Sequence, residues 1–249
     1  NTNTDTQVCV WRCEARKVLV LAFRGTEMIK WKDIVTDAKM MPTGFTEERV
    51  KGWTGGEPNV HEGFLQAFDS IRTKVCSLVD AICATEDGEE PWQVYITGHS
   101  LGGALATLMS QLLCVSVRRG RRRLKVTMYN YGSPRVGNAA FAQEYNDLVP
   151  DSFRLVNTYD GVPRVPLLLN YRHVHHAVYI DRDGTVFPKP PLEIANAPGY
   201  MDGMVDAEEA RDAMETLAVL RGGDAFGEHM EDTYYAALKK SAQAIIDAE

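Results

Sequence analysis

The chain has 249 residues, of which 45% are hydrophobic, 24% charged and 9% aromatic, and its formal net charge is −7. This composition excludes a disordered tail, a collagen-like fibre and a short disulfide-stapled scaffold, and the length is sufficient to bury a sizeable core. An acidic chain is also a poor candidate for binding DNA or RNA through phosphate contacts.

The N-terminal third of the chain begins with strand-like segments. Two short apolar runs, 8–11 and 18–23, flank a charged turn and are predicted to be paired strands. Residues 26–42 mix charges with spaced apolar side chains, and residues 43–60, rich in Gly, Pro and Thr, are expected to form a loop. A helix is expected over 62–84, because apolar side chains recur there at helical spacing.

The rest of the chain alternates strands with helices. The expected strands are 92–97, 124–131, 153–159 and 173–180, and the expected helices are 100–117, 138–148, 207–220 and 230–246. Residues 181–184, Asp-Arg-Asp-Gly, are typical of a hairpin turn, and the Pro-rich segment 188–198 is expected to be loop. This alternation favours an α/β fold, with a mostly parallel central sheet flanked by helices, in a single domain over 1–249.

Membrane insertion and secretion are not favoured. The uncharged stretch 92–117 is long enough for a membrane span, but its polar residues and a Gly-rich break favour a buried strand, turn and helix. The chain begins at Asn1 with no Met and no charged-then-apolar leader, so we expect a piece of a longer precursor. Five cysteines without a Cys-x-x-Cys pair, and the absence of an Asn-x-Ser/Thr sequon, favour reduced thiols and an intracellular compartment.

The most informative segment is 95–106, with the sequence YITGHSLGGALA. It contains Gly-x-Ser-x-Gly between a predicted strand and a predicted helix. A nucleophilic serine must project from a very sharp turn with small residues two positions away on either side, and Gly98 and Gly102 provide this for Ser100. The backbone N–H of Leu101 would then point at a developing oxyanion. The alternative is an ordinary Gly-rich turn from strand to helix.

A serine hydrolase of this architecture has its residues in the order Ser, acid, His. The acid is expected just past the carboxyl end of a later strand, where Asp160 follows the strand 153–159. His229 follows a Gly-containing loop and opens the last helix, which fits a general base reaching back to the site, although a surface histidine is the alternative. His173 and His175 alternate as in a zinc site, but no fitting Cys or acidic partner is evident, so no metal is expected.

Several blocks of the chain resemble the class 3 lipases, the α/β-hydrolase family of fungal and plant triacylglycerol lipases. These blocks are 22–26 (AFRGT), 60–64 (VHEGF), 98–106 (GHSLGGALA), 131–138 (YGSPRVGN), 157–166 (NTYDGVPRVP) and 228–235 (EHMEDTYY). The last block looks most like plant and algal members. One departure is His175, where the family commonly has glycine.

The resemblance implies a catalytic triad of Ser100, Asp160 and His229, with Thr26 and Leu101 as the donors of the oxyanion hole. It implies no cofactor, and a lipid substrate at a membrane or droplet interface. The resemblance also places a helical lid in segment 26–42, where the apolar side chains expected to contact lipid are Met28, Trp31, Ile34 and Val35. The alternative for this segment is a surface helix packed on the core.

Residues 118–125, Arg-Arg-Gly-Arg-Arg-Arg-Leu-Lys, hold six positive charges on an acidic chain. A solvated loop is favoured over docking to anionic lipid headgroups. The leading functional hypothesis is a serine carboxylester hydrolase acting on acyl lipids, either triacylglycerol or a polar glycerolipid. The alternatives are a soluble-ester or feruloyl-type esterase on the same scaffold, and a non-catalytic lipase-like signalling module.

Overall fold

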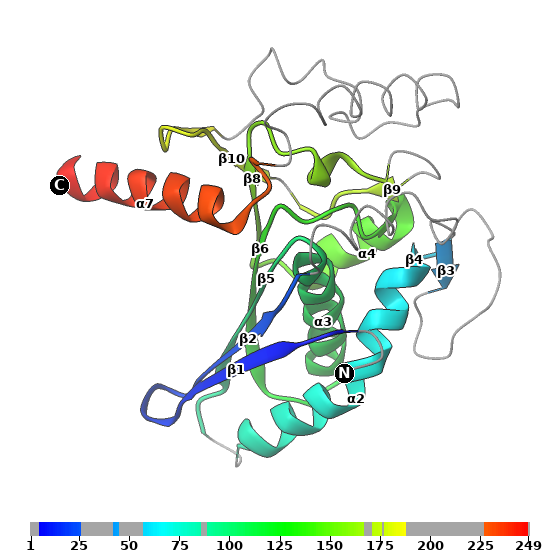
Figure 1. Ribbon diagram of the computed structural model, residues 1–249. Coiled ribbons are helices and arrows are strands. Elements are labelled where there is room, and N and C mark those ends of the chain that lie inside the picture. The colour runs from blue at the N-terminus through cyan, green and yellow to red at the C-terminus, as the bar shows by residue number, and fades with distance from the viewer. Residues whose placement is uncertain are drawn as a thin grey trace.

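A seven-stranded sheet, in the order β1-β2-β5-β6-β8-β10-β11, runs through the molecule (Figure 1). The computed structural model describes residues 5–25, 42–44, 57–85, 89–166, 171–175, 177–187 and 227–248. The strands of this sheet are β1 Val8–Cys13, β2 Val18–Phe23, β5 Trp92–His99, β6 Leu124–Tyr131, β8 Ser152–Asn157, β10 Ala177–Ile180 and β11 Val186–Phe187. The five strands from β2 to β10 pair in parallel, and the two edge strands pair antiparallel to their neighbours.

The side chains of the central strands alternate between a buried and a half-buried face. In β5, Val94 and Ile96 are fully buried, whereas Tyr95 and Thr97 between them are only half-buried. Successive side chains of a strand point to opposite faces of the sheet, so the buried set of each strand forms one continuous apolar surface. Helices cover that surface, and the core lies between them and the sheet.

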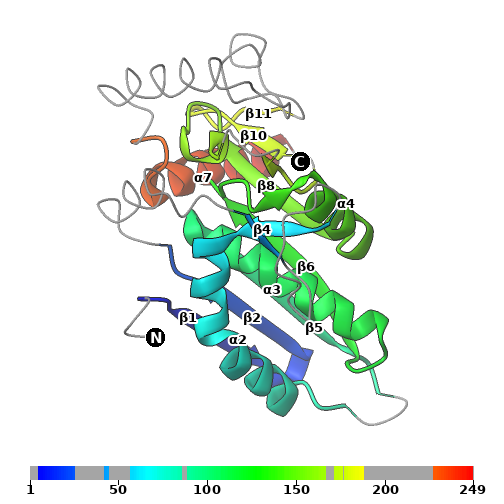
Figure 2. The ribbon, with the colours of Figure 1, turned by 90° about the vertical axis from the view of Figure 1, so that its right-hand side faces the viewer.

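Three helices lie on one side of the sheet and a fourth lies on the other (Figures 1 and 2). The three are α2 Glu62–Ile82, α3 Leu101–Arg118 and α4 Ala139–Leu148, and the fourth is α7 Glu231–Ala248. Among the described helices only α3 has the length and apolarity of a membrane span, and it is mostly buried against β5, β6 and α2. The prediction of a buried strand, turn and helix over 92–117 is therefore confirmed.

A second, smaller sheet has the order β3-β4-β7-β9. Its strands are β3 Pro42–Gly44, β4 Asn59–His61, β7 Gly137–Asn138 and β9 Tyr171–Arg172. The prediction that 43–60 is loop throughout is wrong at both ends, because β3 and β4 lie there. Strand β4 pairs with β7, and β7 pairs with β9, so these short strands depend on partners distant in sequence that a local pattern cannot show.

The predicted strand 173–180 is wrong in its first half. Residues 173–175 separate β9 from β10, and His175 has a backbone φ of 46°, which interrupts an extended chain. The hairpin turn over 181–184 is confirmed, since the Gly184 N–H donates to the Asp181 carbonyl at 2.9 Å between β10 and β11. Two 3-10 turns, η1 Glu14–Arg16 and η3 Val162–Arg164, join other elements. The predicted lid side chains, the 188–198 loop and the 207–220 helix lie outside the described residues.

Candidate active site

Ser100 occupies a strained turn between β5, which ends at His99, and α3, which begins at Leu101. Its backbone has φ 58° and ψ −126°, a conformation that costs a non-glycine residue roughly 1–3 kcal/mol and persists only where the surroundings hold it. The Ser100 N–H donates to the Tyr131 carbonyl at 2.9 Å, and the Ser100 carbonyl accepts from the Gly103 N–H at 2.9 Å. These bonds fix the turn that presents the serine.

The glycines around Ser100 allow backbone segments to approach one another closely. A Cβ added at Gly98 would lie 2.2 Å from the carbonyl carbon of Gly102, and one added at Gly102 would lie 2.1 Å from the Phe23 carbonyl oxygen. Real Cβ atoms do not come so near to backbone atoms. The small residues that the motif requires therefore let α3 begin directly against β2 and β5.

Asp160 and His229 lie 69 positions apart in sequence and meet in a buried hydrogen bond. The His229 Nδ1 lies 2.8 Å from the Asp160 Oδ2, and the two residues are 4% and 1% exposed. Asp160 follows the end of β8, and its Oδ1 accepts from the Val162 N–H at 2.8 Å. With one oxygen held by the backbone and the other facing the imidazole, the carboxylate is fixed in orientation.

Tyr234, on the first turns of α7, also contacts the carboxylate, and no sequence motif pointed to it. Its hydroxyl donates to the Asp160 Oδ2 at 2.6 Å and accepts from the Asn157 N–H at 3.0 Å. The ring is 3% exposed. Nothing in the spacing of Tyr234 from His229 predicts this contact, because it depends on how α7 is placed against the end of β8.

A half-buried ion pair holds the residue that directly precedes His229. Glu228 is 6% exposed, its carboxylate accepts from the Arg182 Nε at 2.6 Å, and its backbone carbonyl accepts from the Asn157 side chain at 2.9 Å. Arg182 belongs to the turn between β10 and β11. The hairpin at the edge of the sheet therefore anchors the residue that directly precedes the histidine.

The His99 and His229 rings lie side by side, with centroids 4.5 Å apart and planes inclined by 33°. Burial lowers the pKa of His99 to about 4, and the nearby His229 acts in the same direction. His99 is therefore neutral at pH 7, and its ring contacts the His229 ring without carrying a charge.

Ser100 lies at the same end of the sheet as the hydrogen-bonded pair of Asp160 and His229. Gly132 follows Tyr131, whose carbonyl holds Ser100, and a Cβ added at Gly132 would lie 2.8 Å from the Asp160 Oδ2 and 3.1 Å from the His229 ring. The Ser100 Oγ is buried and, within the described residues, makes no hydrogen bond. Hydrogen bonds between a nucleophile and its base are often long before substrate binds, so this arrangement is compatible with a triad.

Of the two predicted oxyanion donors, the structure describes Leu101. It is the first residue of α3, where backbone N–H groups have no acceptor within the helix. Thr26 lies outside the described residues, as do Met28, Trp31, Ile34 and Val35. Gly25, which directly precedes Thr26, packs beside the serine, since a Cβ added there would lie 3.3 Å from the Ser100 Cβ.

The histidines considered for a zinc site bond to separate backbone carbonyls. The His173 Nε2 lies 2.6 Å from the Pro163 oxygen, and the His175 Nε2 lies 2.7 Å from the Val149 oxygen. No group of three or more His, Cys, Asp or Glu side chains in the described part of the chain is arranged to hold a metal ion. These two rings serve the packing between β9, α4 and the 3-10 turn η3.

Comparison with known proteins places these features in context. A family model described as "Lipase (class 3)" matches residues 20–170. The chain is 32% identical over 161 residues to phospholipase A(1) DAD1, chloroplastic, of Arabidopsis thaliana, covering 61% of this chain and 34% of that protein. It is 30% identical over 181 residues to secreted mono- and diacylglycerol lipase 1 of Fusarium solani, covering 72% and 49%.

Among solved structures, the triacylglyceride lipase of Rhizomucor miehei matches with a TM-score of 0.56 and 28% identity, over 71% of this chain and 62% of that one. The likeness supports an α/β-hydrolase fold for the described sheet and helices. The chain spans about a third to a half of the length of the curated relatives it matches.

Proposed function

The chain belongs to the class 3 lipase family, and on this basis we propose that it is a serine carboxylester hydrolase that cleaves acyl esters of lipids. The observation that carries the proposal is the buried hydrogen bond between Asp160 and His229 at the end of the sheet where Ser100 sits in its strained turn. This is the set of groups that an acyl-transfer reaction needs, in the chain order expected for the fold.

In the proposed reaction, the Ser100 Oγ attacks the ester carbonyl carbon while the His229 Nε2 takes its proton. The His229 Nδ1–H remains bonded to Asp160, which fixes the tautomer and stabilises the imidazolium that forms. The backbone N–H groups of Leu101 and Thr26 stabilise the oxyanion. His229 then gives the proton to the leaving alcohol, and a water molecule hydrolyses the acyl-enzyme by the same sequence of steps.

The proposed substrates are acyl lipids, either triacylglycerol or a polar glycerolipid, met at a membrane or droplet interface. The similar proteins support this class, because their names include a phospholipase A(1), a mono- and diacylglycerol lipase and a triacylglyceride lipase. We propose that the chain forms one domain and that segment 26–42 is its lid. In Trp31→Asp, hydrolysis of emulsified lipid should fall while hydrolysis of a soluble short ester stays near the wild-type rate. Equal losses on both substrates would contradict the lid.

We propose an intracellular compartment. The relatives named above divide between a chloroplastic and a secreted protein. All five cysteines are free thiols, and Cys9 and Cys13 are exposed, which suits a reducing environment. Protein isolated from its native cells and alkylated in denaturant should carry five modified thiols, and recovery of disulfide-bonded protein would contradict this assignment.

A fluorophosphonate probe tests the nucleophile directly. The probe should label the wild type and not Ser100→Ala. In Asp160→Asn, which keeps the size of the side chain, kcat should fall by about 10⁴ because the imidazole loses its correct tautomer. An unlabelled, folded wild type would make the chain a non-catalytic module. Labelling with full activity on soluble esters and no gain on lipid would instead indicate a soluble-ester esterase.

A further inference from the structure

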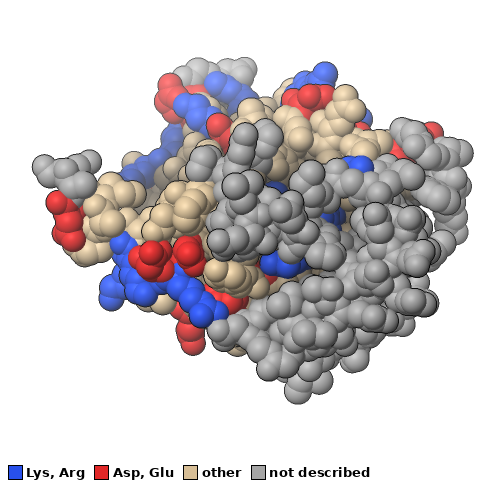
Figure 3. Space-filling model, turned by 90° about the horizontal axis from the view of Figure 1, so that it is seen from above, with Lys and Arg blue, Asp and Glu red and all other residues tan. Residues whose placement is uncertain are grey.

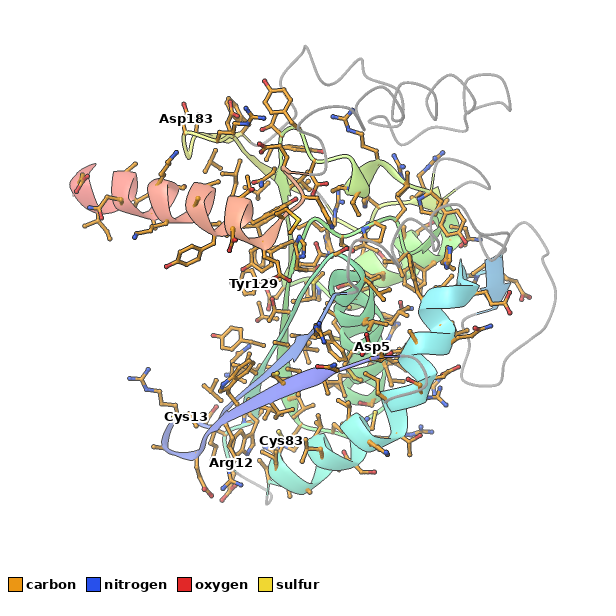
Figure 4. The ribbon with its side chains drawn as sticks, in the orientation of Figure 1. Asp5, Arg12, Cys13, Cys83, Tyr129 and Asp183 are labelled. Atoms are coloured by element: carbon orange, nitrogen blue, oxygen red, sulfur yellow. The ribbon has the colours of Figure 1, made fainter. Side chains whose placement is uncertain are left out.

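The basic segment 118–125 lies at the opposite end of the molecule from Ser100. Strand β6 begins at Leu124, and its other end, Tyr131, pairs with His99 beside the serine. Eight residues of strand separate the two ends by roughly 23 Å. Figure 4 labels Cys83, at the end of α2, in this lower region together with Arg12 and Cys13. The basic segment is therefore not part of the candidate active site.

A recess of about 440 Å³ opens in this region. The last turn of α2 and the residues after it form one wall, and residues 120–124 form the other. Among the described residues, three arginines line it against the one carboxylate of Asp80, and the apolar side chains of Val79 and Leu124 also contribute to the lining. This volume falls within the range of about 300–1,000 Å³ that small-molecule sites occupy.

The arginines of the recess are held in place. The Arg122 guanidinium is bound by both oxygens of Asp80, at 2.5 and 2.9 Å, and only 18% of its side chain is exposed. The Arg123 Nη2 donates to the Glu89 carbonyl at 2.9 Å. The Arg122 side chain also bonds to the Cys76 thiol. Because an arginine presents five donors in a rigid fork, one guanidinium can bond several acceptors at a time.

We propose that this recess binds a small molecule carrying a phosphate group, at a site separate from hydrolysis. Arginine forks match phosphate oxygens in pairs, and the Val79 and Leu124 side chains offer contact to the organic part of such a ligand. A lipid headgroup has the same chemistry. However, the recess and Ser100 lie at opposite ends of the parallel strands, so one flat lipid surface cannot serve both, which favours a soluble ligand.

The charged side chains at the end of the molecule that carries α7 are arranged differently from those at the recess. Figure 3 looks down on the end that carries α7, and on the described part of that surface basic and acidic side chains lie next to one another. At the recess, by comparison, arginines outnumber carboxylates in the lining. On the lining alone, a soluble anion is therefore expected at the recess.

Isothermal titration at low ionic strength tests the proposal, with glycerol 3-phosphate as the probe and glycerol as its neutral counterpart. Glycerol 3-phosphate should bind saturably at one site per chain, and glycerol should not bind. Arg121→Ala combined with Arg123→Ala should weaken binding at least tenfold. The matched control, Lys74→Ala with Lys239→Ala, removes two exposed cations elsewhere and should bind as the wild type does.

Three results would overturn the proposal. They are the absence of saturable binding, equal binding by the two double variants, and displacement by chloride as effective as by phosphate. Vesicle binding distinguishes a soluble phosphate ester from a lipid headgroup. Binding to vesicles of phosphatidic acid in phosphatidylcholine is compared with binding to phosphatidylcholine alone. Binding to acidic vesicles that needs Arg121 and Arg123, without binding of glycerol 3-phosphate, would make the segment a membrane surface instead. Hydrolysis of a soluble ester should be unchanged in both variants, so the test is independent of the proposed activity.

Discussion

The two ends of the parallel sheet hold their polar groups in different ways. At the carboxyl end, Asp160, His229 and Tyr234 are at most 4% exposed, and defined hydrogen bonds join them. At the amino end, Arg121 and Arg123 are exposed, and the best-held arginine, Arg122, faces a carboxylate whose side chain is 55% exposed.

At the carboxyl end, the polar groups are buried, so stability depends on the exact position of each one. An unpaired polar group there bears its full desolvation cost. At the amino end, water reaches the Asp80 carboxylate and the outer arginines, so each ion pair there contributes less to stability.

The largest difference in stability is expected between alanine substitutions of glycines at the two ends of the sheet. Gly102→Ala places a Cβ 2.1 Å from the Phe23 carbonyl oxygen and should prevent folding, because both partners are backbone. Gly120→Ala meets nothing within 4 Å, so only its φ of 69° opposes the change, at about 1–2 kcal/mol. Soluble yield and thermal unfolding measure both. A Gly102→Ala variant with wild-type stability would show that the serine turn is not held as tightly as argued.

Tyr234→Phe should reduce activity without unfolding the protein. It removes one hydrogen bond to the Asp160 carboxylate, and bonds to charged groups contribute about 1.5–3 kcal/mol, so kcat/KM should fall about tenfold to a hundredfold. The loss should appear in kcat and not in KM, because the residue acts through Asp160. Tyr235→Phe is the matched control, since Tyr235 is 68% exposed. Equal kinetics for the two variants would exclude a positioning role for the buried hydroxyl.

Acidification should weaken the carboxyl end through its buried histidines. Burial lowers the pKa of His61 to about 4, and its ring accepts the Gly63 N–H at 3.1 Å as the N-cap of α2. The unfolded chain therefore binds a proton between about pH 6.5 and 4 that the folded chain does not bind. The contribution of His61 to the free energy of unfolding is fully present above pH 6.5 and decreases as the pH falls towards 4, by up to about 1.4 kcal/mol per pH unit.

His61→Asn keeps a capping oxygen and removes this titration. Urea unfolding between pH 7.5 and 4.5 should give a shallower decrease in the variant, by about one proton. The loss of ring contact with Phe64, whose centroid lies 4.2 Å away, lowers stability equally at all these pH values and leaves the slope unaffected. An unchanged slope would assign the pH dependence to other groups.

The sequence predicted most of the main sheet because its strands and helices have strong local patterns. Helix α2 and strand β6 begin at the expected residues, and the serine turn follows from the need for small neighbours around Ser100. The short strands β3, β4, β7 and β9 could not be predicted, because each depends on a partner far along the chain.

The surroundings of the proposed triad could not be predicted for the same reason. The contact of Tyr234 with Asp160 and the ion pair between Glu228 and Arg182 arise only when α7 and the β10–β11 hairpin meet at the end of β8. Motif and chain order pointed to Asp160 and His229, because those rules encode chemistry. They say nothing of the groups that hold these residues in place.

The smallest effect on stability is expected from the ion pair between Asp80 and Arg122. A double-mutant cycle with Asp80→Asn and Arg122→Gln should give a coupling energy of about 0.5 kcal/mol, because water reaches the carboxylate. Asp80→Asn should nevertheless strengthen the binding of glycerol 3-phosphate, since it removes the one carboxylate among the described residues that line the recess. A coupling of about 2 kcal/mol, as is typical of buried bonds to charged groups, would mean that this end is built like the other and that position, not charge, controls it.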